Sequence, residues 1–518
     1  MSEGNGRQLP PGWAETELES IVDVLDGARV PVNAKERSKR TGTIPYYGAT
    51  GQVGWIDDFL FDETLVLLGE DGAPFFDKER HVSYLVKGKS WVNNHAHVLR
   101  TVVGIDASLL SHQLNVVDYH SFVSGTTRWK LNQAPMRKIP LKVPPATEQS
   151  RIADALDELF SDLDAGVAAI ERAREKLKLY RASVLKAAVE GALTAEWRAQ
   201  HPQTEPATEL LECILAERRR RWEEDQLAKF KTKGQEPPKH WKAKYKEPVA
   251  PDTTNLPALP EGWCWASIDT LIVEGPQNGV YLPGPAYGRG VPILRIDDFQ
   301  NGWVRQRDEL NKVEADSRST GTYALRQGDL VINRVNSMSH LGKCVIAGDQ
   351  LDGVLFESNM MRMQLARSVE ATYVEFYLRS ELGRQRLTKD AKWAVNQASI
   401  NQQDVKRTAL PLPPAGEQEA IVEAVEDQLS VIDHLEAELD AKLKNAQSLR
   451  QAILRHAFTG QLVPQDPNDE PASELLKRIA AEREARSCSA TMAKRATGRP
   501  RPRRRPGPQE PREARREG

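Results

Sequence analysis

The chain contains one helix-starting motif twice, as Pro144-Pro145-Ala146-Thr147-Glu148-Gln149 and again, 269 residues later, as Pro413-Pro414-Ala415-Gly416-Glu417-Gln418. The same shift holds without a gap from residues 131–133 to residues 191–193. After a four-residue adjustment, residues 206–211 return as residues 471–476. A third echo opens each half, as Leu9-Pro10-Pro11-Gly12-Trp13 and Leu259-Pro260-Glu261-Gly262-Trp263. A period this long indicates a duplicated pair of domains rather than a solenoid.

Length and composition place the chain among soluble multidomain proteins. A chain of 518 residues is too long for one hydrophobic core, so we expect three or four domains. No run of 18 apolar residues occurs, and no basic-then-apolar signal opens the chain, so the sequence favours neither a membrane nor a secreted protein and we expect a cytoplasmic one. The four cysteines lie far apart without a C-x-x-C pair, which predicts reduced thiols rather than zinc ligands or disulfides.

The charge is nearly balanced in the whole chain and in each half. The net charge is −2; residues 1–140 hold 15 basic and 17 acidic residues, and residues 255–410 hold 18 of each. A protein that binds DNA unaided normally has a clear basic excess. Neither of these two blocks has such an excess.

Two blocks, residues 1–140 and 259–410, have the pattern of mixed α/β globular domains. Short strand-like runs at residues 65–68, 98–103, 291–296 and 329–332 alternate with Gly, Asn and Asp turns. Away from their borders the two blocks share little sequence. The duplication therefore preserved a frame while the contents diverged.

The repeated segments, 141–216 and 411–483, predict two long helices. From Ile152 and from Ile421, positions in steps of four and three form a heptad seam over five heptads, the signature of a coiled coil. We expect Thr147 or Gly416 to cap each start and Gly191 or Gly460 to end each helix, giving about 42 residues, or roughly 63 Å. Two amphipathic helices packed on their own domains are the alternative. The predicted seam residues are Ile152, Leu156, Leu159, Leu163, Ile170, Leu177, Ile421, Val425, Ile432, Leu435, Leu439, Leu449 and Ile453.

Two further segments are basic. Residues 217–258 predict a basic linker whose arginine run, 218–221, and lysine–aromatic string, 239–246, either contact phosphates or form a solvated linker with a helical start. Residues 484–518 predict a disordered basic tail, a weak DNA tether or a solubilising end.

Signatures of catalysis are missing from the sequence. Gly88-Lys89-Ser90 has Ser83 where a P-loop needs glycine, and no Gly-x-Gly-x-x-Gly motif follows a strand. The amino-methyltransferase tetrad and the Gly-x-Ser-x-Gly elbow are absent as well. Asn94-His95-Ala96-His97 has no third metal ligand nearby, so a turn or a DNA contact suits it better. We therefore predict no catalytic residue, no metal site and no bound cofactor.

The chain resembles the specificity subunit of a Type I restriction–modification system. The resemblance rests on the two helix starts, the two helix ends, the opening motif 9–13, Ile44-Pro45-Tyr46-Tyr47-Gly48-Ala49 and Asn93-Asn94-His95, taken together. The resemblance covers roughly residues 9–483. It implies α/β target-recognition domains separated by an antiparallel coiled coil with a pseudo-twofold internal repeat. It also implies a non-catalytic subunit that reads a bipartite, asymmetric sequence in double-stranded DNA.

Partners follow from the same resemblance. Two modification subunits would bind S-adenosylmethionine and methylate adenine, and restriction subunits driven by ATP, with Mg²⁺, would cleave DNA. Clamping by such partners would explain the near-neutral charge of the reader.

For base readout, the chemistry requires Arg or Lys for guanine, Asn or Gln for adenine, and small polar or aromatic side chains on loops. Turn chemistry or a solvated surface is the alternative for each single residue. The candidates in the first domain are Tyr46, Tyr47, Asn93, Asn94, His95, Arg128 and Lys130. The candidates in the second domain are Arg289, Asn333, Arg334, Asn336, Ser337, His340 and Lys343.

Two functions from other classes stay open on the sequence alone. A DNA methyltransferase or nuclease fragment would modify or cut DNA by itself, whereas an adapter would not. A coiled-coil scaffold without DNA binding would leave two unlike α/β domains without a task.

Overall fold

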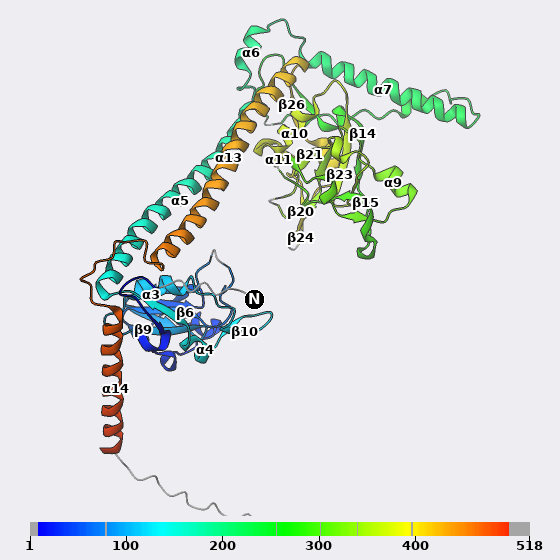
Figure 1. The fold of residues 1–518 in the computed structure, drawn as a ribbon. Helices are drawn as coiled ribbons and strands as arrows, with labels where there is room; N and C mark the ends of the chain where they lie inside the picture. Colours follow the sequence, from blue (N-terminus) through cyan, green and yellow to red (C-terminus); the bar gives the residue numbers. More distant parts are fainter. Residues whose placement is uncertain are drawn as a thin grey trace, which may run out of the picture. The chain divides into compact units, whose positions relative to one another are not determined.

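The computed structural model describes residues 9–77, 80–254, 256–300, 302–338, 340–394 and 397–496, with side chains as far as residue 489. The chain divides into two compact units: unit 1 holds residues 1–170 and 441–518, and unit 2 holds residues 171–440. Each unit contains one α/β domain, the start of one long helix and the end of the other (Figure 1). We call the two α/β domains domain 1 and domain 2.

Domain 1, in unit 1, is built on a four-stranded antiparallel sheet in the order β2-β9-β6-β7. Its central strand β6 (Leu65–Gly69) is buried at every position, which agrees with its unbroken apolar run. Helix α3 (Ala107–Leu114) packs Leu110 and Leu114 against the sheet. A second sheet, β4-β3-β8-β5, contains the parallel pair of β3 and β8.

Domain 2, in unit 2, repeats this topology with different residues. Its antiparallel sheet has the order β14-β23-β19-β21, with the buried β19 (Leu330–Asn333) at the corresponding place. Helix α10 (Ala371–Arg379) buries Tyr373 and Tyr377 in the same core. A second sheet again contains one parallel pair, β15 with β22. The frame that the sequence predicted is therefore common to both domains, and the predicted mixed α/β class is confirmed.

In domain 1 the other strands are β1 (Ala14–Glu17), β2 (Val22–Val24), β3 (Ile44–Gly48), β4 (Gly51–Ile56), β5 (Phe61–Asp62), β7 (Ser83–Val86), β8 (Lys89–Val92), β9 (Ala96–Thr101), β10 (Val123–Ser124), β11 (Lys130–Leu131) and β12 (Pro140–Val143), and its short helices include α1 (Leu18–Ile21) and α4 (Gln133–Arg137). In domain 2 the strands include β13 (Cys264–Ser267), β14 (Ile272–Asn278), β15 (Tyr287–Leu294), β18 (Lys312–Val313), β20 (Val335–Asn336), β21 (Cys344–Ile346), β22 (Leu355–Phe356), β23 (Met360–Leu365), β24 (Lys392–Ala394), β25 (Gln397–Ser399) and β26 (Ala409–Leu412), with helices α8 (Ile268–Leu271), α9 (Ser317–Tyr323), α11 (Glu381–Leu387) and α12 (Gln402–Arg407).

The two long helices are α5 (Ala146–Val189) and α13 (Ala415–Ala457), and they pair antiparallel. In unit 2, Arg174 lies 3.4 Å from Asp440, and Arg181, seven residues further along α5, pairs with Asp433 and Glu436, which come earlier in α13. Facing residues therefore run in opposite directions along the two helices. The predicted antiparallel pairing is confirmed.

The predicted seam of this coiled coil is confirmed for one of its two sets of heptad positions. One set of positions, spaced by seven residues from Val425 through Ile432 to Leu439, is buried or half-buried as expected. The second set is shifted by one residue. Leu429 is buried instead of Gln428, which the step of three from Val425 predicts, and Phe160 is buried instead of Leu159. The predicted seam residues Leu159, Leu435 and Leu449 are wrong, because they are exposed at 38%, 39% and 52%.

The other predicted seam residues face inward to a greater or lesser degree. Neighbouring residues on a helix point about 100° apart, so residues on either side of the regularly buried set lie three or four positions from it. Only packing against the partner helix decides which of these residues is buried. The buried or half-buried members of the prediction are Ile152, Leu156, Leu163, Ile170, Leu177, Ile421, Val425, Ile432, Leu439 and Ile453.

Each long helix starts with the same hydrogen bond, from a tryptophan to a glutamate. Trp13 Nε1 donates to Glu148 Oε2 at 3.0 Å in unit 1, and Trp263 Nε1 donates to Glu417 Oε2 at 2.8 Å in unit 2. The helices begin at the alanine after the two prolines, so neither Thr147 nor Gly416 is the N-cap, and that prediction is wrong. The repeated motif therefore ties the start of each helix to the opening Trp of the same domain.

The glutamines of the motif, Gln149 and Gln418, make a second pair of hydrogen bonds that is the same in both units. Gln149 Nε2 donates to the Pro144 carbonyl at 3.0 Å, and its Oε1 accepts from the amide of Asp106 at 2.9 Å. Gln418 makes the same pair of bonds, to the Pro413 carbonyl and from the Glu370 amide, both at 2.9 Å. These bonds fix each helix to its domain through backbone groups, which is why the motif is repeated while the domains differ.

Gly191 and Gly460 follow the ends of the two helices with φ of 73° and 69°, as predicted. A Cβ at Gly191 would lie 2.6 Å from the Pro260 side chain, and one at Gly460 would lie 2.6 Å from that of Pro10. Both a positive φ and a close approach therefore require glycine here.

Each unit carries one more helix at an equivalent place, α7 (Ala207–Thr232) in unit 2 and α14 (Ala472–Ala496) in unit 1. The amide of Ala207 bonds the Gly262 carbonyl, and that of Ala472 bonds the Gly12 carbonyl, both at 2.8 Å. Arg218 donates to the Asp269 carbonyl of α8, and Arg483 donates to the Glu19 carbonyl of α1.

These two helices change the boundaries expected from the sequence. Helix α7 runs through the predicted start of the basic linker at residue 217, and α14 runs past the predicted start of the disordered tail at residue 484. The rest of the predicted tail, residues 497–518, lies outside the described residues. Within the described ranges, no helix is both long and apolar enough to cross a membrane.

Candidate nucleic-acid interface

In domain 1 the residue after the central strand joins two loops. The amide of Glu70 donates to the His95 carbonyl at 2.8 Å, and the Glu70 carbonyl accepts from the amide of Leu131 at 2.8 Å. The turn after β8 and the strand β11 therefore meet beside the end of β6. The hydrogen bond from the Asn93 amide to the Tyr47 carbonyl, 3.1 Å, brings the end of β3 to the same place.

Five of the seven predicted residues of domain 1 gather around this point. His95 Nδ1 lies 3.4 Å from Asp71 Oδ2, Arg128 Nε lies 2.8 Å from Asp71 Oδ1, and Lys130 Nζ lies 3.5 Å from Glu70 Oε1. Asn94 is exposed beside them, and Asn93 Oδ1 accepts from the His95 amide at 2.8 Å, which shapes the turn. The structure therefore brings together polar side chains that are 35 residues apart along the chain.

Tyr46 and Tyr47, which are adjacent in β3, differ in what they can contact. Tyr46 is 1% exposed, and its hydroxyl donates to the Val32 carbonyl at 3.0 Å, so the prediction that it contacts DNA is wrong. Tyr47 is half-buried, with its ring 5.9 Å from that of Tyr84. Alternation along the strand places one ring in the core and leaves the other beside the loops.

A buried ionic cluster lies beneath these loops. His97 Nδ1 lies 2.6 Å from Asp26 Oδ2, and His97 Nε2 lies 2.8 Å from the Leu131 carbonyl. Arg29 donates to Glu70 and to the Ala96 carbonyl, both at 2.7 Å. Burial by itself raises the pKa of the Asp26 carboxyl, but the hydrogen bond and charge of His97 and the Val98 amide outweigh it, and the pKa is lowered.

Asp26, Glu70 and His97 are close enough together to suggest a metal site. Both ring nitrogens of His97 face acceptors, however, so neither offers a lone pair to a metal ion. Arg29 already neutralises Glu70. The chemistry of this donor set fits a structural ion cluster, and its effect is to hold the 128–131 segment against strand β9.

Domain 2 has the same backbone frame around Arg334. The amide of Arg334 donates to the Asn359 carbonyl at 2.8 Å, and the Arg334 carbonyl accepts from the amide of Ile400 at 3.0 Å. Arg334 therefore corresponds to Glu70, Asn359 to His95 and Ile400 to Leu131. The side chain of Arg334 donates to the Ser358 carbonyl at 3.0 Å.

The predicted polar loop of domain 2, residues 333–343, closes on itself. Ser337 Oγ lies 2.9 Å from His340 Nδ1, and the Ser337 amide donates to Asn336 Oδ1 at 2.7 Å. Lys343 is half-buried at the far end of the loop, and burial lowers the pKa of its amine. The loop thus presents Asn336, Ser337 and His340 together at one edge of the domain.

Two predictions in domain 2 fail on position. Asn333 is fully buried and its Nδ2 donates to the His340 carbonyl at 3.3 Å, so it holds the loop from inside and the prediction that it contacts bases is wrong. Arg289 lies on β15, away from the loop, and its guanidinium pairs with Glu314. It stays exposed, but the structure does not bring it to the other six residues.

Sequence reasoning missed two features of these sites. The acids Glu70 and Asp71 lie among the predicted cations, and no motif marks them. In domain 2 the hairpin of β24 and β25 pairs with β20, next to the loop, and carries Trp393 at 72% exposure. A tryptophan preceded by a lysine in a polar context was the available signal, because aromatic rings stack on bases.

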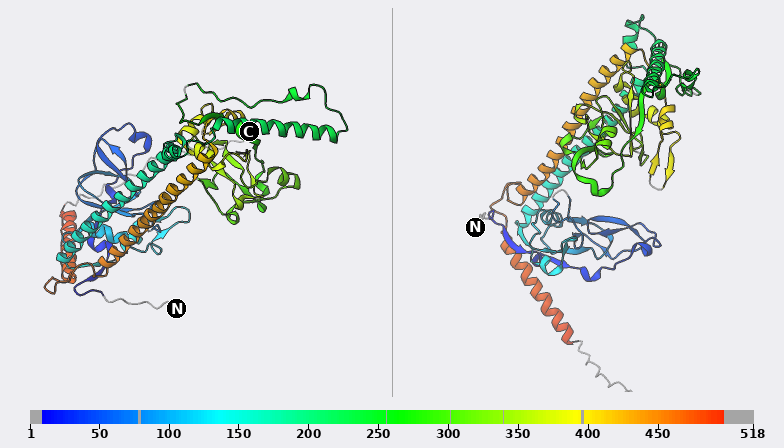
Figure 2. Two further views of the ribbon diagram at one scale, coloured as in Figure 1. Left: turned by 90° about the horizontal axis from the view of Figure 1, so that it is seen from above. Right: turned by 90° about the vertical axis from the view of Figure 1, so that its right-hand side faces the viewer.

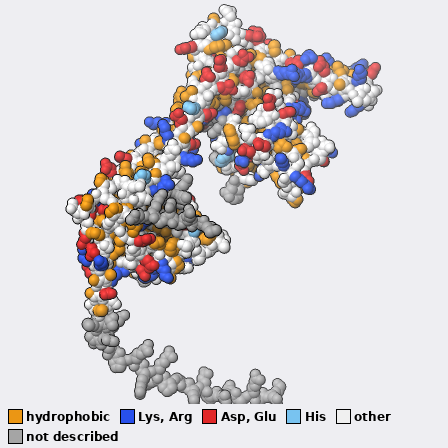
Figure 3. All heavy atoms as spheres, in the orientation of Figure 1, with side chains coloured by type: hydrophobic (Ala, Val, Ile, Leu, Met, Phe, Trp, Pro, Cys, Tyr) orange, Lys and Arg blue, Asp and Glu red, His pale blue; other side chains and the backbone are white. Residues whose placement is uncertain are grey.

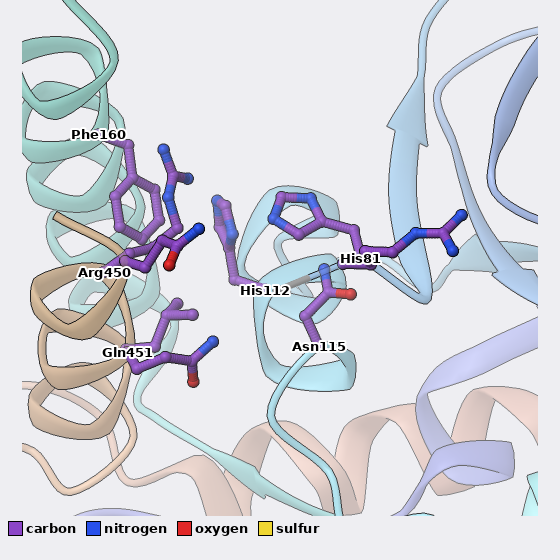
Figure 4. Close-up of a pocket in the computed structure, with 9 residues that line it drawn as sticks. His81, His112, Asn115, Phe160, Arg450 and Gln451 are labelled. Carbon is purple, nitrogen blue, oxygen red and sulfur yellow. The ribbon is translucent and has the colours of Figure 1, made fainter. Parts of the chain in front are cut away.

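A small basic cavity of about 120 Å³ lies within unit 1, between α3 and the long helices (Figure 4). Figure 4 shows the His112 ring directed toward Phe160 of α5 and Arg450 of α13. The centroids of His112 and Phe160 are 5.2 Å apart, and the Arg450 guanidinium lies 4.5 Å over the Phe160 ring. Burial lowers the pKa of His112 and His81, and the charge of Arg450 acts in the same direction.

Comparison with known proteins agrees with this arrangement. The family model described as Type I restriction modification DNA specificity domain matches residues 10–172 and 278–445, so it matches once in each half. The specificity subunit of the Type I restriction enzyme EcoKI from Escherichia coli strain K12 is 27% identical over 512 residues, covering 92% of this chain and 97% of that subunit. The StySPI specificity subunit from Salmonella potsdam is 23% identical over 525 residues, covering 95% of this chain and 100% of that subunit.

A solved structure is similar in fold. It is described as the structural basis underlying complex assembly and conformational transition of the type I R-M system, and it aligns with a TM-score of 0.58 at 17% identity, covering 88% of this chain and 99% of that one. The likeness concerns the fold alone. Both alternatives, the catalytic fragment and the scaffold without DNA, are set aside by the family match. With its two matched copies and its two α/β domains on paired helices, the chain belongs to the Type I restriction modification DNA specificity domain family, as a non-catalytic specificity subunit that recognises DNA.

Proposed function

We propose that this chain reads a bipartite, asymmetric sequence in double-stranded DNA, with each domain contacting one half, and directs modification and restriction subunits to it. One observation carries this proposal. The same backbone frame holds Glu70 in domain 1 and Arg334 in domain 2, so one scaffold presents two different sets of side chains. Two unlike readers on one scaffold suit a target with two unlike halves.

The contacts in domain 1 are assigned to the loop group of Tyr47, Asn94, His95, Arg128 and Lys130. Asp71 holds Arg128 and His95 in place, and Glu70 holds Lys130. In domain 2 the group is Arg334, Asn336, Ser337, His340 and Lys343. Side chains of these types hydrogen-bond base edges, while phosphate contacts set the register on the duplex.

The repeated helix starts support two equivalent docking surfaces. The bonds of Trp13 with Glu148 and of Trp263 with Glu417 repeat the same local structure in the two units. Two identical partners require two similar surfaces on one chain. The chemistry would then be theirs: modification subunits that use S-adenosylmethionine on adenine, and restriction subunits that use ATP and Mg²⁺.

A domain exchange tests the two-reader proposal. Residues 13–140 would be replaced by the corresponding block of a relative, and methylated adenines would be located by sequencing the genome. One half of the modified sequence should change and the other should stay. A change in both halves together would contradict the proposal.

A second experiment tests whether the paired helices set the gap between the half-sites. Asp164 faces Arg450, so residues 164–170 and 444–450 are facing heptads in unit 1. Deleting both shortens each helix by roughly 10 Å, near three base pairs at roughly 3.4 Å each. The spacing between the two halves of the methylated sequence should shorten accordingly. Active modification with an unchanged spacing would show that the helices do not set it.

A further inference from the structure

Helix α7 of unit 2 continues well beyond the domain that it packs on. Its first turns bury Ala207 and Ile214 in the core of domain 2, and Arg218 reaches the Asp269 carbonyl. From residue 219 to Thr232 the helix extends a further 20 Å or so at about 1.5 Å per residue. The chain that follows runs back beside it (Figure 2).

Aromatic side chains hold the returning chain against the helix. The rings of Trp222 and Trp241 stack with centroids 5.7 Å apart, Tyr245 lies 5.3 Å from Trp222, and Phe230 lies 6.3 Å from Trp241. The aromatic side chains of this segment therefore pack against each other. We call residues 219–246 the arm.

Charge divides the arm into two parts. Near the domain, Arg220 pairs with Glu217 and Glu224, Arg221 pairs with Glu217, and Arg219 pairs with Glu223. Arg219, Arg220 and Arg221 are therefore paired with acids of their own helix, and Arg218 is paired with Asp269 of domain 2. This pairing disfavours the phosphate-binding role considered for the arginine run from the sequence. Figure 3 shows basic side chains along α7 and at its far end.

The last part of the arm, residues 229–246, which we call the lysine tip, runs from the end of α7 back to Tyr245 beside Trp222. It holds seven lysines against the single acid Glu236. All seven are exposed, and only Lys242 has an ion-pair partner, Glu223, among the residues that the structure describes. This tip carries the excess of positive charge that domain 2 itself lacks. The six lysines for which the described residues provide no ion-pair partner are Lys229, Lys231, Lys233, Lys239, Lys244 and Lys246.

We propose that the lysine tip of the arm binds the phosphate backbone of duplex DNA without regard to sequence. Protein interfaces have an apolar centre and are depleted in lysine, whereas this tip is rich in lysine and its aromatic rings face each other. Phosphate contacts need only mobile cations, and each contact releases counterions. The proposal goes beyond the recognition of bases by the two domains, because it assigns to the arm a share of the phosphate attraction that they do not supply.

Salt dependence tests the proposal directly. The full chain would be titrated against a labelled duplex of unrelated sequence at several KCl concentrations, with fluorescence anisotropy as the readout. The variant Lys229→Gln/Lys231→Gln/Lys244→Gln should reduce the slope of log K against log[salt] by roughly 2.7, at about 0.9 for each phosphate contact. The matched variant Lys229→Arg/Lys231→Arg/Lys244→Arg should keep the wild-type slope.

A second control uses the same helix. Arg219→Gln/Arg220→Gln/Arg221→Gln removes three charges that are already paired, so its slope should stay within about one of the wild-type value. An unchanged slope in the lysine-to-glutamine variant would overturn the proposal, as would loss of co-purifying modification subunits with DNA binding intact, which would make the tip a protein-docking site. The methylated sequence should be the same in all these variants, so a failed domain exchange and a failed arm remain distinguishable.

Discussion

Glu70 of domain 1 and Arg334 of domain 2 occupy the same position in one backbone frame, each directly after the buried central strand of its sheet. In both, the amide donates to the neighbouring loop and the carbonyl accepts from the segment that leads to the long helix. A carboxylate in one domain and a guanidinium in the other are tolerated because only backbone groups make these bonds. The frame is therefore constant while the charge presented beside the loops changes sign.

Arg128→Ala should reduce discrimination at one base pair of the first half-site by about 1–3 kcal/mol, if Arg128 leaves Asp71 to make a bidentate guanine contact. The measurement is competition binding with single-base variants of the site. Tyr46→Phe is the control: it removes a buried hydrogen bond to Val32 and should cost about 1 kcal/mol of stability without changing the sequence read. Equal loss of affinity on every sequence would make Arg128 a phosphate contact instead.

Glu417→Gln should destabilise the protein more than Glu148→Gln. Glu417 accepts from Trp263 and Thr194 and pairs with Arg198, whereas Glu148 accepts from Trp13 while its other oxygen has no hydrogen-bond partner among the described residues. Burial raises the pKa of the Glu148 carboxyl, so neutralising it removes an unfavourable buried charge. Thermal unfolding followed by circular dichroism should show a loss of about 3 kcal/mol for Glu417→Gln and about 1 kcal/mol or less for Glu148→Gln. Equal losses would mean that Glu148 and Glu417 contribute the same free energy to folding.

Ile432→Lys should unfold the coiled coil of unit 2, while Leu435→Lys on the same helix should be tolerated. Ile432 is fully buried, and Leu435 is 39% exposed, although both belong to the seam predicted from the sequence. Burying a lysine in place of isoleucine costs about 3 kcal/mol or more, whereas a half-exposed site lets the amine reach water. Urea unfolding of the two variants decides the register, and the reverse order of stabilities would restore the predicted seam.

Unit 1 should lose stability as the pH falls through about 6.5. Burial and the charge of Arg450 lower the pKa of His81 and His112, with Asp164 and Asp157 acting in the opposite direction. The unfolded chain therefore binds protons that the folded unit does not, and stability present above the ordinary histidine pKa of about 6.5 is lost below it. Thermal unfolding between pH 7.5 and 5.5 should show a smaller decline for His112→Gln than for the wild type. Parallel declines would mean that His112 makes no contribution.

Much of the fold follows from local pattern. Strand β6 is an unbroken apolar run, the two long helices follow from a seven-residue period, and glycines mark their ends. These features depend on propensity and periodicity within a few residues, so the sequence alone predicts them. The long repeat also predicts that two domains share one frame, since residues that bond backbone groups, such as Gln149 and Gln418, recur at one spacing.

The sites depend on contacts between distant parts of the chain. Whether Leu159 or Phe160 faces the partner helix, and whether Tyr46 or Tyr47 faces the core, is decided by what packs against them. The pairing of Arg128 with Asp71 and the bond from Trp13 to Glu148 join residues that no local pattern connects. The sequence by itself determined the repeat, the helices and the alternation of strands; only the tertiary structure decided which neighbour is buried and which cation is already paired, because burial and ion pairing belong to the packed chain and not to the segment.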